Sequence, residues 1–300
     1  MGVDVKLLYA LAALAVGAAA GQTASLPNEF LALDTAIVPD LRRDFLQRSK
    51  IEILKKLGYP GLAVCALDRE HWRHLVDNVI PCLDEKQLKL YAVYSGAWVA
   101  RGNYGINPEL KANLPHLAGR GTVIWLPISS REFKPSGPAG DDMAVAPVGE
   151  VAEAAAAHGL TVSLYPHVND GLERVSDAVR IAEKTGRKDV GVTLNLCHWL
   201  KVEGADTMEL AVRAAIPRLT VVTINGADRD GRGWTQPLDS GNFDVAAFLR
   251  ALHRAGYRGP IGLQGFTVAD RYHVQPVENL RRSMTAWKNL SRLTASKNSP

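Results

Sequence analysis

The feature that most constrains this fold is a series of short, β-rich apolar runs that alternate with helical patterns along the chain. Helical periodicity marks the segments 40–58, 146–159, 171–186 and 243–256 between them. This alternation predicts parallel strands joined by helical crossovers. The runs are almost continuously apolar, which indicates strands covered on both faces. The eight runs are 30–35, 61–66, 88–96, 122–129, 161–167, 190–196, 219–225 and 260–265.

The joins between these elements differ at the two ends of the strands. In "LKKLGYPGLAV" and "LHRAGYRGPIGL" a helix ends on glycine and a strand follows at once. The joins from strand to helix, at 97–120 and 130–147, are long and rich in Gly, Pro, Asn and Asp. Eight strands with elaborate loops at one end predict an α/β fold, a single-domain (β/α)8 TIM barrel with its site on the long-loop face. No glycine pattern typical of dinucleotide or P-loop sites follows the first strand.

Composition limits the partners that we expect. With 47% hydrophobic and 22% charged residues in 300, the chain can bury the core of one large domain. The net charge of +4 is small and the basic residues are dispersed, so no nucleic acid is expected as a partner. Cys65, Cys82 and Cys197 are too few for a disulfide framework, and buried, unreactive thiols are expected.

The N-terminus has the pattern of a secretory signal peptide. Lys6 precedes a short apolar run, and Ala18 and Ala20 supply an A-x-A cleavage site. The alternative is an uncleaved anchor, but the run is short for a membrane span. We therefore predict a signal peptide over 1–20, a barrel over 28–290 and a C-terminal tail over 291–300. The mature protein would be secreted or periplasmic, without a stable membrane span.

Polar and aromatic side chains follow the predicted strands, where the site of a barrel lies. Amides and imidazoles exchange hydrogen bonds with hydroxyl groups, and aromatic rings cover C–H faces. This mixture predicts a small-molecule carbohydrate as ligand. The residues concerned are Asp34, Tyr94, Trp98, Tyr165, His167, Asn195, His198, Asn225, Asp228, Arg229, Arg232 and Gln264.

Several stretches of the second half resemble a known superfamily. They are "HGLTVSLYPH", "VGVTLNLCHWLKVEGAD", "LTVVTINGAD" and "PLDSGNFDVAAFLRALHRAGYRGPIGLQG". The chain resembles the sugar phosphate isomerase/epimerase superfamily, the xylose isomerase-like TIM barrels that also include endonuclease IV. The resemblance covers about residues 28–290 and implies an enzyme that acts on a sugar or keto-sugar.

The resemblance also implies one divalent metal, held by Glu, Asp, His and Glu on strands five to eight, with the two glutamates moving protons. In this sequence the four positions are occupied by Tyr165, Asn195, Asn225 and Gln264. His198, after the sixth strand, matches a histidine that contacts substrate in the family. A basic residue after the seventh strand is matched by Arg229 or Arg232.

These substitutions change what the site can do. Amide oxygens can bind a hard cation but carry no charge to offset its dehydration. Each lost close charge pair removes roughly 4 kcal/mol even at an effective dielectric constant of 20. Asn and Gln cannot act as bases either. We therefore expect an altered site, with or without a metal. The weak metal-ligand candidates are His167, Asn195, Asn225 and Gln264.

The catalytic candidates are His167, His198 and Tyr165, because a histidine pair supports acid–base chemistry near neutral pH. The predicted substrate contacts are Asn195, Asn225, Gln264, Asp228, Arg232 and Trp98.

Two functions remain open. The favoured one is an exported isomerase- or epimerase-like enzyme acting on a sugar or keto-sugar, and the alternative is a non-catalytic carbohydrate-binding barrel. A nuclease is disfavoured, because the strand ends do not supply the acidic, histidine-rich cluster that endonuclease IV needs. The other histidines are expected on surface helices or loops: His71, His74, His116, His158, His253 and His273.

Overall fold

The computed structural model describes residues 25–41 and 44–296, and within them eight parallel strands close into a barrel. The signal peptide predicted over 1–20 lies outside the described residues. Around the barrel the strands follow the order β1-β11-β10-β9-β8-β6-β3-β2. In chain order they are β1 (Phe30–Leu33), β2 (Gly61–Cys65), β3 (Lys89–Tyr94), β6 (Val123–Leu126), β8 (Thr161–Leu164), β9 (Val190–Asn195), β10 (Leu219–Ile224) and β11 (Ile261–Leu263).

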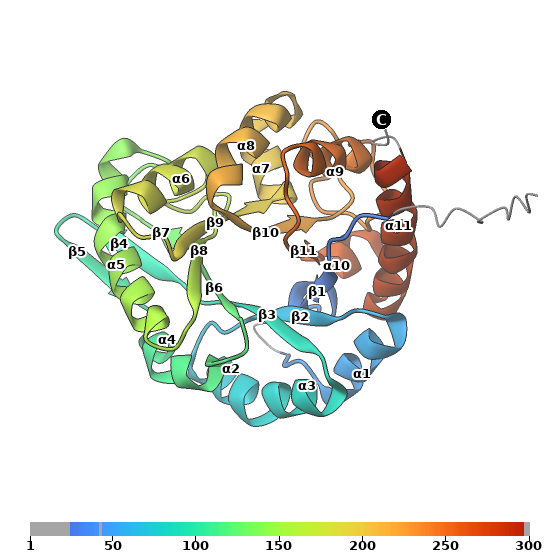
Figure 1. Ribbon diagram of the computed structural model, residues 1–300, viewed down its shortest axis with the longest axis horizontal. Helices are drawn as coiled ribbons and strands as arrows, with labels where there is room; N and C mark the ends of the chain where they lie inside the picture. Colours follow the sequence, from blue (N-terminus) through green and yellow to red (C-terminus); the bar gives the residue numbers. More distant parts are fainter. Residues whose placement is uncertain (1–24, 42–43, 297–300) are drawn as a thin grey trace, which may run out of the picture.

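Each barrel strand lies inside one of the eight predicted runs, so the predicted TIM barrel is confirmed. Helices form a ring around the strands (Figure 1). Within the described residues, no helix is both long enough and apolar enough to cross a membrane. The helices are α1 (Arg48–Leu57), α2 (Arg69–His74), α3 (Ile80–Lys86), α4 (Pro108–Asn113), α5 (Pro138–Ala156), α6 (Val175–Lys184), α7 (Leu196–Glu203), α8 (Met208–Ala215), α9 (Val245–Arg254), α10 (Val268–Tyr272) and α11 (Pro276–Ser296).

Several helix boundaries differ from those expected. The first helix begins at Arg48 instead of residue 40, because Gln47 is still extended. Helix α5 begins at Pro138, inside the stretch 130–147 that we expected to be a loop, since proline suits the first turn of a helix. Helix α11 continues to Ser296, past the expected boundary at residue 290.

The long loops at the carboxyl ends of the strands build a second, smaller sheet. Its strands β4 (Ala97–Ala100), β5 (Asn103–Ile106) and β7 (Ile128–Ser129) are ordered β5-β4-β7. Helix α5 contacts β4 and β5, and Figure 1 shows all three at one side of the ring. The stretch 97–120, expected as a loop, therefore contains ordered strands.

The barrel interior is filled by side chains. Leu31, Leu33, Trp125 and Val221 pack together inside it. The Ser163 hydroxyl on β8 lies 2.7 Å from that of Thr193 on the neighbouring strand β9. A filled lumen leaves only the carboxyl ends of the strands as a place for a ligand.

Two histidines expected at the surface instead hold the segment before α1. The ring nitrogens of His71 each lie 2.7 Å from an acceptor, Asp68 Oδ1 and the Leu41 carbonyl oxygen. His74 Nε2 donates to the Leu46 carbonyl oxygen at 2.9 Å. The expectation was wrong for His71, whose side chain is only 9% exposed, because α2 packs against this segment.

A buried carboxylate links β1 to β2. Asp34, directly after β1, is 3% exposed, and its Oδ2 accepts the Cys65 backbone N–H at 2.6 Å. Its Oδ1 is buried and has no hydrogen-bond partner among the described residues. Burial raises the pKa of Asp34 to about 6, although the bond from Cys65 opposes the shift.

The close approach of β2 to β3 gives a first prediction. A methyl group on Gly61 would lie 2.0 Å from the Lys89 carbonyl oxygen, whereas one on Gly149, in α5, would meet nothing within 4 Å. We expect Gly61→Ala to lower the free energy of unfolding by roughly 2–4 kcal/mol. The control Gly149→Ala should raise it by about 0.5–1 kcal/mol, since it stiffens a helix. Urea unfolding measures both, and equal effects would contradict the close approach.

Asp34 gives a second prediction. A folded-state pKa raised from 3.8 to about 6 means that ionisation of Asp34 costs the folded state about 3 kcal/mol above pH 6. This cost disappears as the pH falls below about 3, where the carboxyl is protonated in both states. The stability of Asp34→Asn relative to wild type should therefore rise by about 2.5 kcal/mol between pH 4 and pH 8. Urea unfolding at both pH values measures it. Asp77→Asn, at an exposed position, should show no such trend.

Candidate functional site

Aromatic rings and imidazoles from several loops meet at the carboxyl ends of β3, β8 and β9. Tyr165 packs edge-on against Tyr94, with ring centroids 5.1 Å apart, and against His198 at 5.9 Å. His198 also contacts His167 at 4.1 Å and Trp234 at 5.5 Å. The structure therefore brings together the three side chains that we predicted as catalytic, Tyr165, His167 and His198.

The backbone of Val168 orients both histidines. His167 Nδ1 donates to the Val168 carbonyl oxygen at 2.9 Å, which leaves a lone pair on Nε2. The Val168 N–H donates to His198 Nδ1 at 3.5 Å, which puts the proton of a neutral His198 on Nε2. These hydrogen-bond partners assign one ring as a proton acceptor and its neighbour as a proton donor.

Burial sets the charge of His198. His198 is 4% exposed, and desolvation together with the neighbouring His167 lowers its pKa well below the usual value. His198 is therefore neutral at neutral pH. Asp170 Oδ2 lies 3.9 Å from His167 Nδ1, too far for a hydrogen bond. Burial raises the pKa of Asp170, and His167 opposes that shift.

Tyr165 is coupled to Asn195, the residue at the end of β9. Asn195 Nδ2 donates to the Tyr165 hydroxyl oxygen, so the phenolic proton remains available for another acceptor. Asn195 Oδ1 accepts from the backbone N–H of Cys197 at 3.1 Å and caps the start of α7. Burial raises the pKa of Tyr165 well above its usual value. Tyr165 can therefore donate a proton or hydrogen bond at neutral pH, but it cannot act as a base.

The side-chain amides of Gln264 and Asn225, at the ends of the last two strands, differ in whether their oxygen atom has a hydrogen-bond donor. Gln264 Oε1 accepts from the Thr35 hydroxyl at 2.5 Å and from the Gly265 N–H at 2.9 Å. Asn225 Nδ2 donates to the carbonyl oxygens of Gly226 at 2.6 Å and Trp234 at 2.8 Å. Asn225 Oδ1 is buried without a hydrogen-bond partner among the described residues. A buried acceptor of this kind needs a donor, which a substrate hydroxyl would supply.

The donor set does not fit the divalent metal that the family resemblance implies. The oxygens of Asn195 and Gln264 already accept backbone hydrogen bonds, and no acidic side chain stands at the four positions. In the part of the chain that the structure describes, no three His, Cys, Asp or Glu side chains form a group that could hold a metal ion. Asn225 Oδ1 alone among these amide oxygens lacks a partner there, and one neutral ligand does not bind such a cation.

The other predicted contacts lie outside this cluster. Arg229 pairs with Asp206, and Arg232 pairs with Asp230 at 3.0 Å while its side chain is 88% exposed. Asp228 is half-buried, and its carboxylate lies beside Gly233. Trp98 lies on β4 of the smaller sheet.

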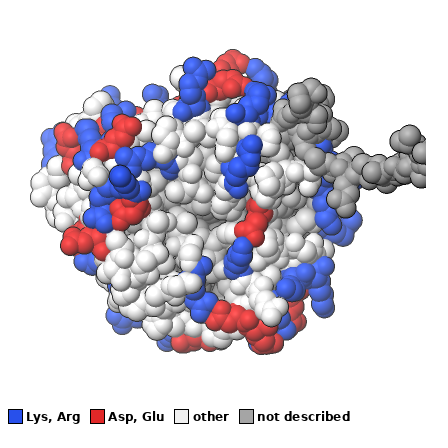
Figure 2. Space-filling view, in the orientation of Figure 1, with Lys and Arg blue, Asp and Glu red and all other residues white. Residues whose placement is uncertain are grey.

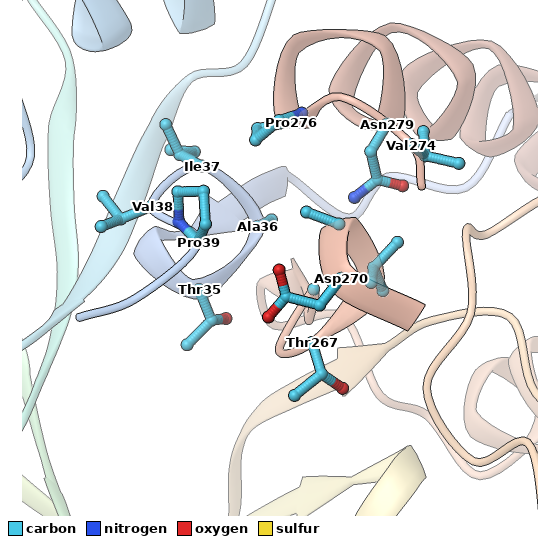
Figure 3. Close-up of a pocket in the computed structure, with 13 residues that line it drawn as sticks. Thr35, Ala36, Ile37, Val38, Pro39, Thr267, Asp270, Val274, Pro276 and Asn279 are labelled. Carbon is cyan, nitrogen blue, oxygen red and sulfur yellow. The ribbon is translucent and has the colours of Figure 1, made fainter. Parts of the chain in front are cut away.

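The structure also adds residues that the sequence analysis missed. Asp170 and Trp234 join the cluster, and Asp170 follows His167 by three residues, a signal that was available in the sequence. A hollow between the end of β1 and α10 contains Asp270, whose carboxylate Figure 3 shows between Thr35 and Thr267. No sequence pattern marked Asp270, because its place depends on how α10 packs near β1.

Comparison with known proteins agrees with this architecture. A family model described as a xylose isomerase-like TIM barrel matches residues 110–290. No curated protein sequence matches the chain. Among solved structures, 3-keto-D-glucoside 4-epimerase from E. coli is similar with a TM-score of 0.68 and 18% identity, over 87% of this chain and 99% of that one.

Two further solved structures are similar at low identity, which supports the fold alone. L-ribulose 3-epimerase gives a TM-score of 0.65 with 18% identity, over 90% of this chain and 96% of that one. The IolI protein, whose structure contains a zinc atom, gives 0.69 with 14% identity, over 88% and 98%. The family model spans more than half of the sequence, and the chain therefore belongs to the xylose isomerase-like TIM barrel family.

Proposed function

We propose that this protein is an exported, isomerase- or epimerase-like enzyme that moves a proton on a sugar or keto-sugar with a histidine pair instead of a metal. The observation that carries the proposal is the pair itself. His167 offers an unprotonated Nε2 and His198 a protonated Nε2, with ring centroids 4.1 Å apart. Export rests on the signal peptide predicted over 1–20.

The chemistry follows from these roles. His167 Nε2 takes the proton from a carbon next to the carbonyl group, and the C–H electron pair moves towards the carbonyl oxygen to form an enediolate. His198 Nε2–H and the Tyr165 O–H donate hydrogen bonds to that oxygen as its charge develops. Return of the proton from His167 to the neighbouring carbon, with transfer of the adjacent hydroxyl proton to the former carbonyl oxygen, gives an isomer. An epimer forms when another donor delivers a proton to the face opposite His167. Asn225 Oδ1 accepts from a sugar hydroxyl.

A small, neutral substrate fits the surroundings. Figure 2 shows Lys and Arg interspersed with Asp and Glu on the visible face, separated by broad uncharged areas. Such a face lacks the continuous basic stripe that nucleic-acid binding requires. The similar solved structures include epimerases of a keto-glucoside and of a ketose, which supports a carbohydrate as the substrate class.

Exchange of substrate hydrogen with solvent tests the histidine pair. Wild-type protein in D2O should incorporate deuterium into L-ribulose, D-allulose or methyl 3-keto-D-glucoside, followed by NMR. His167→Gln and His198→Gln should each slow incorporation by roughly 10²–10⁴-fold, the usual contribution of general acid–base catalysis. His116→Gln, at an exposed position, is the matched control and should exchange normally. Unchanged exchange in both site variants would exclude this mechanism.

Metal content tests whether the enzyme works without a metal ion. Protein purified without chelator should contain well under one divalent ion per chain by elemental analysis, because the donor oxygens are neutral or engaged. Treatment with EDTA should leave deuterium exchange unchanged. A stoichiometric ion whose removal abolishes exchange would show that the amides and His167 hold a metal after all.

One observation favours the non-catalytic alternative, a carbohydrate-binding barrel. The side-chain oxygens of Asn195 and Gln264 accept hydrogen bonds from backbone N–H groups. Such a structural role suits a pocket that binds a sugar without catalysing a reaction. The same protein samples distinguish the two functions. Saturable sugar binding by calorimetry without any deuterium exchange would establish the binding protein.

A further inference from the structure

The small sheet continues the barrel wall beyond the rim. Strand β4 follows β3 after two residues, and β7 follows β6 after one. Backbone hydrogen bonds bridge the two continuations, from Ser95 N–H to the Trp125 carbonyl oxygen and from Ala97 N–H to that of Pro127, both at 3.0 Å. The ladder therefore passes from the barrel into the small sheet without a break.

Side-chain alternation along this ladder places Trp98 on the lumen side. Successive side chains of a strand point to opposite faces, so Tyr94, Gly96 and Trp98 share one face. Ala97 and Val99, on either side of Trp98 in the sequence, point to the opposite face and are buried in the larger hydrophobic core. Trp98 is 44% exposed, on the face that continues from the ring of Tyr94 in the site.

Its partners in the sheet share this face. Trp98 pairs with Ser129 on β7 and with Gly105 on β5. A methyl group on Gly96 would lie 3.5 Å from Cγ of the buried Pro127, so Pro127 packs beneath the strand at Gly96. We call the surface formed by Gly96, Ser129, Gly105 and Trp98 the ramp.

Gly105 holds the indole ring in place. A methyl group on Gly105 would lie 2.4–2.7 Å from Nε1, Cε2 and Cζ2 of Trp98, so the ring lies directly over the glycine backbone. One face of the indole is therefore supported by the sheet, and the ring keeps substantial exposure on its other side. Little side-chain freedom remains to be lost when a ligand stacks on it.

The chemistry of the ramp selects its ligand. Its four residues carry no charge, which disfavours a phosphate or a carboxylate. An exposed indole ring covers the C–H face of a sugar ring. Trp98 lies four residues after Tyr94, at most about 14 Å along an extended chain. Since Tyr94 packs against Tyr165, the ramp leads from Trp98 to the edge of the aromatic cluster.

We infer that the substrate is a glycoside whose reacting ring lies against Tyr165 and His198 and whose second, neutral sugar ring stacks on Trp98. The inference rests on the proposed function and adds the substrate class. Trp98 acts as a specificity residue and does not touch the reacting atoms.

Calorimetric titration with cellobiose, maltose, D-glucose and D-fructose tests this inference. Wild type should bind at least one disaccharide about tenfold more tightly than either monosaccharide. Trp98→Ala should remove that preference, whereas Trp98→Phe should keep most of it. Gly105→Ala should reproduce the loss, since its methyl group displaces the ring without deleting it. His198→Gln should weaken both kinds of sugar.

The outcomes separate this inference from the proposed function. A disaccharide preference that survives in Trp98→Ala, or monosaccharide binding in wild type without any such preference, overturns the ramp and leaves the proposed function standing. Absence of binding by all four sugars, together with absence of deuterium exchange, overturns both. Thermal melting verifies that each variant is folded.

Tryptophan fluorescence supplies a second readout. Trp72, Trp125, Trp199 and Trp287 are buried, so quenching by acrylamide reports chiefly on Trp98 and the half-buried Trp234. A bound disaccharide should reduce quenching in wild type and should do so much less in Trp98→Ala. Equal protection in the two proteins would place the second ring elsewhere.

Discussion

Pairing of the first strand with the last is the constraint on which the rest of the structure depends. Phe30, Leu31 and Ala32 of β1 lie in parallel register with Ile261, Gly262 and Leu263 of β11. This ladder removes both sheet edges and brings all carboxyl ends of the strands to one rim. The hydrogen bond from Thr35 to Gln264 joins residues 229 apart in sequence, and it exists only because the barrel closes. Every side chain of the site depends on the same closure.

At this rim, two of the four positions that the family resemblance assigns to metal ligands carry amides that bind the protein's own backbone. Asn195 Oδ1 accepts from the backbone of α7, and Gln264 Oε1 accepts from the backbone that follows β11. Each amide satisfies buried groups that an ionised carboxylate would satisfy only at a desolvation cost. None of the four positions that the resemblance assigns to metal ligands carries an acid, although Asp170 lies 3.9 Å from His167. The remaining titratable pair consists of imidazoles, and burial keeps His198 uncharged.

The fold was predictable from local sequence, whereas the site was only partly so. Strand periodicity and glycine-terminated helices are local signals, and Gly58 does take the left-handed conformation, with φ 88°, that its position after a helix predicted. The strand-end rule found Tyr165, His167 and His198 because all three lie within a few residues of a strand. It could not show that Asn195 caps a helix, that His71 is nearly buried, or that Asp34 loses its solvent, because packing between distant elements decides these properties.

A site whose four metal-ligand positions carry no acid discriminates between ligands in a different way. A metal or a carboxylate selects by charge, and its attraction extends over several ångströms. Hydrogen bonds and ring stacking act only at contact, so selectivity must come from shape and from the number of groups engaged. Asn225 Oδ1 is buried and has no hydrogen-bond partner in the part of the chain that the structure describes, and Trp98 rests on Gly105. The two are then complementary, because one requires a hydroxyl and the other requires an apolar ring face. A carbohydrate carries both features on one molecule, and a second ring lets it engage both residues at once.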